Sequence, residues 1–186
     1  TGNHDYKGIT DNKVLYKKLK MPSEYYSFMK KNWVFVFLNT NEIAAYSNVV
    51  GTAKEQELLR IQNQIKVNKE IQGARWNGGV SSRQLQWLDN LLKKSEKKNR
   101  NVLIFCHHPL YPRSQFTALN NMEILDVINR YNCVKAIFSG HHHSGAFGYF
   151  DHIPCNTVEG MIETPDKNSF GIVRIYKDRI ELEGKE

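Results

Sequence analysis

The sequence contains little cysteine. Its 186 residues include only three cysteines, at positions 106, 133 and 155, and no C-x-x-C pair. An odd number of widely spaced thiols does not form the paired framework of a disulfide-rich protein. Two of the three lie in or beside apolar stretches, where a free thiol packs as a small hydrophobe. This usage favours a reducing compartment such as the cytoplasm.

Long apolar runs are also missing. The longest, residues 33–38, is the size of a strand and far short of the ~18 residues that cross a bilayer. We therefore expect no membrane span. No initiator methionine or signal peptide is visible, so the sequence assigns no targeting. With 40% hydrophobic residues, the composition fits one globular domain, since domains usually contain roughly 100–200 residues.

Positive charge exceeds negative charge. The formal net charge is +7, which suits an anionic partner such as a phosphorylated small molecule or a nucleic acid. The lysines are scattered, however, and an ordinary solvated surface has the same appearance. No basic stripe interleaved with aromatic residues occurs, so we do not expect nucleic-acid binding.

Hydrophobic periodicity predicts an alternation of helices and strands. We expect helices over residues 11–19, 53–72 and 81–98, and a fourth that Asn121 caps. The start of the helix over residues 81–98 is the clearest, because Ser81 followed by Gln84 predicts a capping box. Strands are expected over residues 25–28, 33–38, 101–106 and 134–139, with a closing β-hairpin over 172–182 that turns at Asp178. The pattern indicates one layered α/β unit.

Histidines gather in three short segments. Gly140-His141-His142-His143 and Cys106-His107-His108-Pro109 each follow an apolar strand, and Gly2-Asn3-His4-Asp5 opens the chain. In extended backbone, His141 and His143 would project together while His142 would point away. Neutral imidazoles a few ångströms apart bind divalent metals, and α/β sheets place their sites at the carboxyl ends of strands. Together the segments predict a metal site.

Each segment alone has an ordinary structural interpretation. Glycine, asparagine and aspartate form turns, and a single histidine after a strand is commonly structural. Cys106 precedes a histidine, which raises the alternative of a thiol nucleophile. It falls on an apolar strand, and a hydroxide-using metal site needs no such group. Three segments of this kind in one chain favour the metal interpretation.

The series G-N-H-D, H-x-P and G-H-x-H, in this order, resembles the calcineurin-like metallophosphoesterase superfamily. The resemblance implies an α/β/β/α sandwich and two divalent ions, which the ligand types leave open among manganese, iron and zinc. It implies Asn3, His107 and His141 as ligands of one ion and His143 as a ligand of the other.

The same resemblance gives roles to other residues of these segments. His4 would steady the phosphoryl oxygen or protonate the leaving oxygen, and Asp5 would orient His4. The pattern H-x-P puts the ligand two positions before the proline, so His108 is expected to point to the other face. We expect the same of His142, and His152 belongs to no motif.

Two motifs of the superfamily do not occur in the sequence. D-x-H and G-D-x-x-D supply the remaining ligands, and Asp126, Asp151 and Asp166 lie in the wrong places to replace them. The chain opens at the turn that follows the missing strands in the superfamily. We therefore expect residues 1–186 to be the C-terminal portion of a single metallophosphoesterase domain, incomplete on its N-terminal side. The alternative is a degenerate, inactive domain that binds a partner.

A narrower resemblance covers most of residues 76–186. Asn77-Gly78-Gly79, the segment 84–88, the segment 102–112 and the tail 158–178 are similar to the manganese-dependent ADP-ribose/CDP-alcohol diphosphatase family. It implies manganese and a small nucleoside diphosphate substrate joined to a sugar or an alcohol. Tyr111 and Trp76 are candidate walls for the base, on position alone, and packing in the core or at its rim is the favoured alternative for each. Phosphomonoesterase and cyclic-nucleotide phosphodiesterase activity remain alternatives, and the oligomeric state is unassigned.

Overall fold

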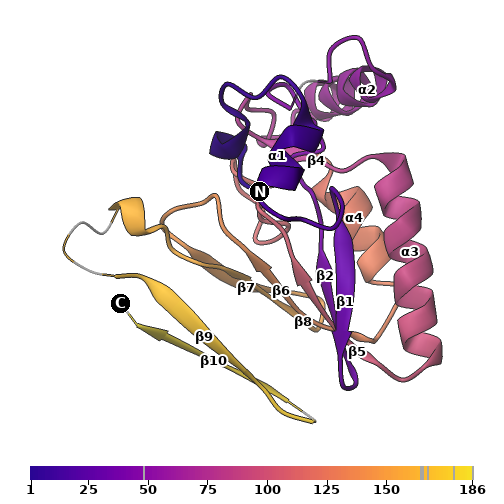
Figure 1. Ribbon diagram of the computed structural model, residues 1–186, viewed down its shortest axis with the longest axis vertical. Helices are drawn as coiled ribbons and strands as arrows, with labels where there is room; N and C mark the ends of the chain where they lie inside the picture. The colour runs from indigo at the N-terminus through magenta and orange to yellow at the C-terminus, as the bar shows by residue number, and fades with distance from the viewer. Residues whose placement is uncertain (48, 164–165, 167, 178, 186) are drawn as a thin grey trace.

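A six-stranded mixed sheet forms the centre of the protein. The computed structural model describes residues 1–47, 49–163, 166, 168–177 and 179–185. The strands run in the order β1-β2-β5-β6-β8-β7 (Figure 1). Their bounds are Tyr26–Lys30 for β1, Trp33–Phe37 for β2, Asn101–Phe105 for β5, Val134–Ser139 for β6, Ala146–Phe150 for β7 and Ile153–Thr157 for β8.

Helices and two short sheets complete the fold. The α-helices are α1 (Asn12–Lys18), α2 (Ala53–Val67), α3 (Ser82–Lys97) and α4 (Asn121–Ile128). The small sheets pair β3 (Ile43–Ala44) with β4 (Gly78–Gly79), and β9 (Phe170–Ile175) with β10 (Ile180–Lys185). Two 3₁₀ turns span Asn3–Tyr6 and Met161–Glu163. Among the residues that the structure describes, no helix is long and apolar enough to cross a membrane.

The centre of the sheet is parallel. Strands β2, β5, β6 and β8 run in one direction, and antiparallel hairpin partners form both edges. The ladder continues past the strand ends, because Leu38 N donates to Phe105 O, Cys106 N to Phe138 O, and Gly140 N to His107 O. The segments that follow β5 and β6 are therefore held side by side.

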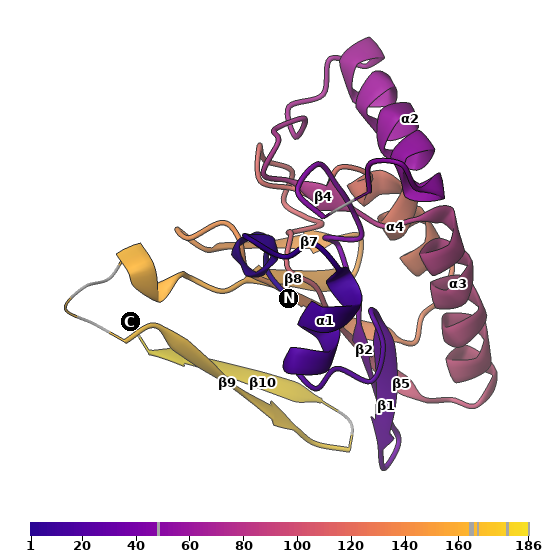
Figure 2. The same cartoon turned by 45° about the horizontal axis from the view of Figure 1, so that its top comes forward.

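Helices α3 and α4 cover one face of the sheet and the β9–β10 hairpin lies on the other (Figures 1 and 2). The main core joins the sheet to α3 and α4, and its fully buried members include Val36, Ile104, Leu88, Leu92, Ile124 and Leu125. The second face buries Trp33, Leu103, Ala136 and Phe138 against Val173, Ile175 and Ile180. The layered α/β arrangement predicted from the sequence is confirmed.

Several boundaries differ from those predicted. Helix α2 ends at Val67 rather than at 72, because Lys69 adopts a left-handed conformation (φ 53°) and Glu70 N bonds back to Ile65 O. The cap of α4 is Asn120 rather than Asn121. Strands β3, β4, β7 and β8 were not predicted. The closing hairpin is confirmed, and its expected turn at Asp178 lies outside the described residues.

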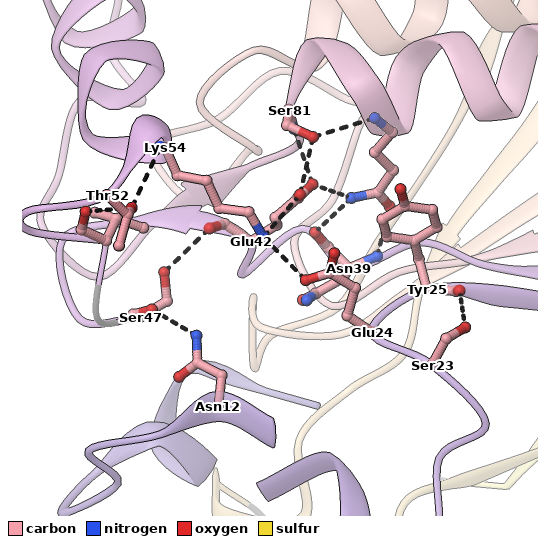
Figure 3. A network of polar contacts seen from close by, with 12 residues as sticks. Asn12, Ser23, Glu24, Tyr25, Asn39, Glu42, Ser47, Thr52, Lys54 and Ser81 are labelled. Carbon is pink, nitrogen blue, oxygen red and sulfur yellow. Dashed lines mark hydrogen bonds and ion pairs between the residues drawn. The ribbon is translucent and has the colours of Figure 1, made fainter. Parts of the chain in front are cut away.

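The buried carboxylate of Glu42 joins the start of α3 to α2 (Figure 3). It is 2% exposed and accepts hydrogen bonds from the Ser81 N–H (3.0 Å), the Ser81 hydroxyl (2.8 Å) and Gln84 Nε2 (2.6 Å). Lys54 Nζ lies 3.0 Å from Glu42 and 2.9 Å from Glu24. The predicted cap is confirmed, since the Ser81 hydroxyl accepts a hydrogen bond from Gln84 N. The second bond of a capping box is absent, because the Ser81 N–H donates to the Glu42 carboxylate and not to the Gln84 side chain.

We expect Glu42→Ala to lower the free energy of unfolding by roughly 3 kcal/mol. The change leaves the buried Ser81 N–H without its acceptor and removes one partner of a buried ion pair. Urea unfolding measures the loss, with Glu24→Ala as the matched control. Glu24 pairs with the same lysine from a more exposed position, so its removal should cost below about 1 kcal/mol. Equal losses in the two variants would contradict the argument.

Candidate metal centre

Side chains from three distant segments meet at the carboxyl edge of the parallel strands. His107 Nε2, just after β5, lies 3.0 Å from Asn3 Oδ1 and 3.0 Å from Nδ1 of His141, which follows β6. The structure thus brings together three of the residues expected as ligands of one ion. Their approach follows from the continued ladder, which places the backbone of His107 against that of Gly140.

The opening turn brings Asn3 close to His107. A Cβ on Gly2 would lie 2.9 Å from His107 Cε1, so only glycine permits this approach. The Asp5 carboxylate accepts a hydrogen bond from Gly2 N–H (2.8 Å) and closes the 3₁₀ turn. The role of Asp5 toward His4 stays a prediction.

The backbone after β6 is not extended. His141 has φ 66°, in the left-handed region, and the chain turns back with Gly145 N donating to His142 O. The expectation that side chains simply alternate along this stretch is therefore wrong. His141 and His143 border one cavity, but His142 borders it too, so the expectation that His142 points away is also wrong. The ring of His142 stacks on that of Phe116, with the two centroids 4.6 Å apart.

His108 does not point to the other face, and that expectation is wrong. The chain bends after β5, and the fully buried ring of His108 lies 4.3 Å from that of His141, centroid to centroid. Its Nδ1 is 2.9 Å from the Thr40 hydroxyl, and its Nε2 is 3.3 Å from both Tyr46 Oη and Trp76 O. Possible ligand atoms of His107, His108 and His141 all lie within 4.8 Å of one another. The His108 nitrogens contact Thr40, Tyr46 and Trp76 and neither Asn3 nor His107, so we interpret His108 as a support for His141.

Burial decides which of these groups are charged. Desolvation, followed by the neighbouring imidazole of His141, lowers the pKa of His107 to about 3. Desolvation, followed by His143, lowers the pKa of His141 to about 4. Both imidazoles are thus neutral at pH 7 and keep a nitrogen lone pair. Burial also raises the pKa of the Cys106 thiol far above its usual range, which keeps it protonated and argues against a thiolate nucleophile.

A cavity of about 460 Å³ opens beside these side chains. Its lining residues are Asn3, His4, Trp76, Phe116, His141, His142, His143 and Ser144. The structure thereby places the expected residues His4 and His143 in the same cavity as Asn3 and His141. Trp76, 48% exposed, also lines it.

Tyr111 lies elsewhere. Its half-buried ring packs against the main core, 5.8 Å from that of Phe150 between centroids, and Tyr111 is absent from the cavity lining. The structure therefore does not support Tyr111 as a wall of this cavity.

Sequence reasoning missed several residues that border the histidines. Thr40 contacts His108, Phe116 stacks on His142, and Asn77 Oδ1 lies 3.0 Å from His141 Nε2. Asn77 carried a signal, since it begins the Asn-Gly-Gly motif, although the motif suggested no role. The other two stand in stretches without a recognisable pattern.

Known proteins resemble this chain in sequence and in fold. Similar curated proteins are the manganese-dependent ADP-ribose/CDP-alcohol diphosphatases of Bos taurus (31% identity over 99% of this chain and 64% of the relative) and Homo sapiens (29% over 99% and 63%). The chain therefore spans slightly under two thirds of these relatives. The crystal structure of a dimetal phosphatase from Danio rerio aligns with a TM-score of 0.87 and 27% identity, covering 98% of this chain and 67% of that one.

The family model of the calcineurin-like phosphoesterases matches residues 1–145, which include all three histidine segments. The match covers more than half of the chain and confirms the resemblance to this family that the motifs indicated. This chain belongs to the calcineurin-like phosphoesterase family.

Proposed function

We propose that this chain supplies one side of the metal centre of a phosphohydrolase that cleaves the pyrophosphate of nucleoside diphosphate-linked substrates. The observation that carries the proposal is the convergence of Asn3 Oδ1, His107 Nε2 and His141 Nδ1, joined by contacts of 3.0 Å. The diphosphatase names of the similar proteins support the substrate class and favour manganese.

The donor set fits a divalent ion. It combines one amide oxygen with two neutral imidazole nitrogens and contains no thiolate, a composition that suits manganese, iron or zinc. For a second ion the chain offers His143, while the aspartates that the superfamily pattern adds have no counterpart in residues 1–186. Two bound ions would neutralise phosphoryl charge and lower the pKa of a bound water.

The remaining cavity residues suit binding and proton transfer. His4 is exposed and lines the cavity together with Asn3, a position from which its imidazole can donate a proton to a leaving oxygen. Trp76 offers an aromatic face on which a nucleobase can stack. The volume of about 460 Å³ lies within the ~300–1,000 Å³ usual for small-molecule sites.

The proposal is tested by His107→Ala and His141→Ala in the complete natural protein. Each change removes one ligand, so we expect loss of bound manganese by elemental analysis and loss of hydrolysis of ADP-ribose and CDP-choline. His152→Ala is the control, because this histidine pairs with Asp151 on the surface and does not line the cavity. Normal metal content and turnover in either ligand variant would refute the proposal. Turnover of only phosphomonoesters or cyclic nucleotides would refute its substrate class.

We expect His4→Ala to retain the metal and to slow the chemical step. Acid catalysis typically accelerates a reaction by ~10²–10⁴-fold, so kcat of the variant should decrease by a factor in that range. A proton donor matters most for poor leaving groups, so the loss should grow as the pKa of the protonated leaving group rises. Equal losses across a series of leaving groups would argue against proton donation.

Trp76→Ala should weaken binding of substrates that carry a base. Stacking of a base on an aromatic side chain contributes about 1–3 kcal/mol, so KM for ADP-ribose should rise about 5- to 150-fold. KM for a phosphodiester without a base should stay unchanged. In the control Tyr111→Phe, KM should stay unchanged for both substrates. The same increase in KM for both substrates would contradict a stacking role.

A further inference from the structure

We propose that Asn77 is a positioning residue that fixes the tautomer of His141 and leaves His141 Nδ1 free to bind the metal. Asn77 precedes β4 and is 1% exposed. Its side chain meets three groups: Gln72 O at 2.8 Å and Gln115 O at 2.7 Å from Nδ2, and His141 Nε2 at 3.0 Å from Oδ1. The inference deepens the proposed function, since it rests on a metal being held at His141.

The two carbonyls determine how the amide is oriented. A backbone carbonyl only accepts, and an amide nitrogen carries two hydrogens, so Gln72 O and Gln115 O take both of them. The reversed amide would place Oδ1 within 2.8 Å of two carbonyl oxygens, which repel it. The Asn77 oxygen therefore faces His141 and can only accept.

An acceptor at this position determines the proton on the imidazole. His141 Nε2 must donate to Asn77 Oδ1, and a neutral imidazole carries a single N–H. An imidazole that binds a metal is neutral. The lone pair consequently resides on Nδ1, the atom 3.0 Å from His107 Nε2.

Two glycines allow the Asn77 segment to come this close. A Cβ on Gly78 would lie 2.4 Å from Thr40 O, and one on Gly79 would lie 2.4 Å from Asn120 Oδ1. Any larger residue would push the segment away from its neighbours. The Asn-Gly-Gly motif thus has a physical explanation: the asparagine orients His141 and the glycines permit the approach.

Long-range ¹H–¹⁵N correlation spectra of the imidazoles test the inference in the metal-free protein near pH 8. Three proteins are compared: wild type, Asn77→Ala and Asn120→Ala. Asn120 is a matched control, because its buried amide bonds Val80 N (3.0 Å) and Val80 O (2.9 Å) in the same stretch without contacting His141.

We expect a proton on Nε2 and a bare Nδ1 for His141 in the wild type and in Asn120→Ala. Asn77→Ala should give averaged resonances of a tautomer mixture. Its affinity for Mn²⁺ should fall about 10–100-fold, the usual effect of losing a group that orients a ligand, while Asn120→Ala keeps wild-type affinity.

Two results would overturn the inference. One is a wild-type His141 protonated on Nδ1, which decides the matter even where Asn77→Ala fails to fold. The other is an Asn77→Ala variant with the wild-type tautomer and affinity. Hydrolysis assays are independent of these spectra, so the failure of the proposed function is distinguishable from the failure of the inference.

Discussion

The parallel pairing of β5 with β6 is the constraint on which the site depends. Phe105 lies opposite Phe138, and the ladder extends through Gly140 N to His107 O. Parallel strands end at one edge of a sheet, so the residues that follow them meet there. The cores on both faces hold this pairing: aliphatic side chains pack against α3 and α4, and aromatic side chains pack toward the β9–β10 hairpin.

Burial gives the site its chemistry as well as its shape. An exposed imidazole would be partly protonated near pH 6.5 and would then compete poorly for a cation. Desolvation of His107 and His141 keeps them neutral, and the adjacent imidazoles add to this effect because each disfavours a charge on its neighbour. The same packing keeps the Cys106 thiol protonated. The edge of the sheet therefore presents neutral nitrogen donors beside an open cavity.

A second set of residues holds the donors in place. Thr40 and the Trp76 carbonyl hold His108 beneath His141, and Asn77 reaches His141 directly. These residues belong to the neighbouring segments that β3 and β4 pair together, and Glu42 anchors the same region to α2 and α3. Substitutions outside the histidine segments can thus alter the positions of these imidazoles.

Local patterns in the sequence determined the main elements and the ligand types. Apolar runs predicted β2, β5 and β6, Ser81 marked the start of α3, and the order of the three histidine segments pointed to the family, because these signals depend on neighbouring residues. Only the tertiary structure decided that His141 adopts a left-handed turn, that His108 packs beneath it, that Glu42 takes the Ser81 N–H, and that Trp76 rather than Tyr111 lines the cavity. Asn77 and His141 are 64 residues apart in sequence. Their contact arises from packing between segments, which no periodicity within either segment encodes.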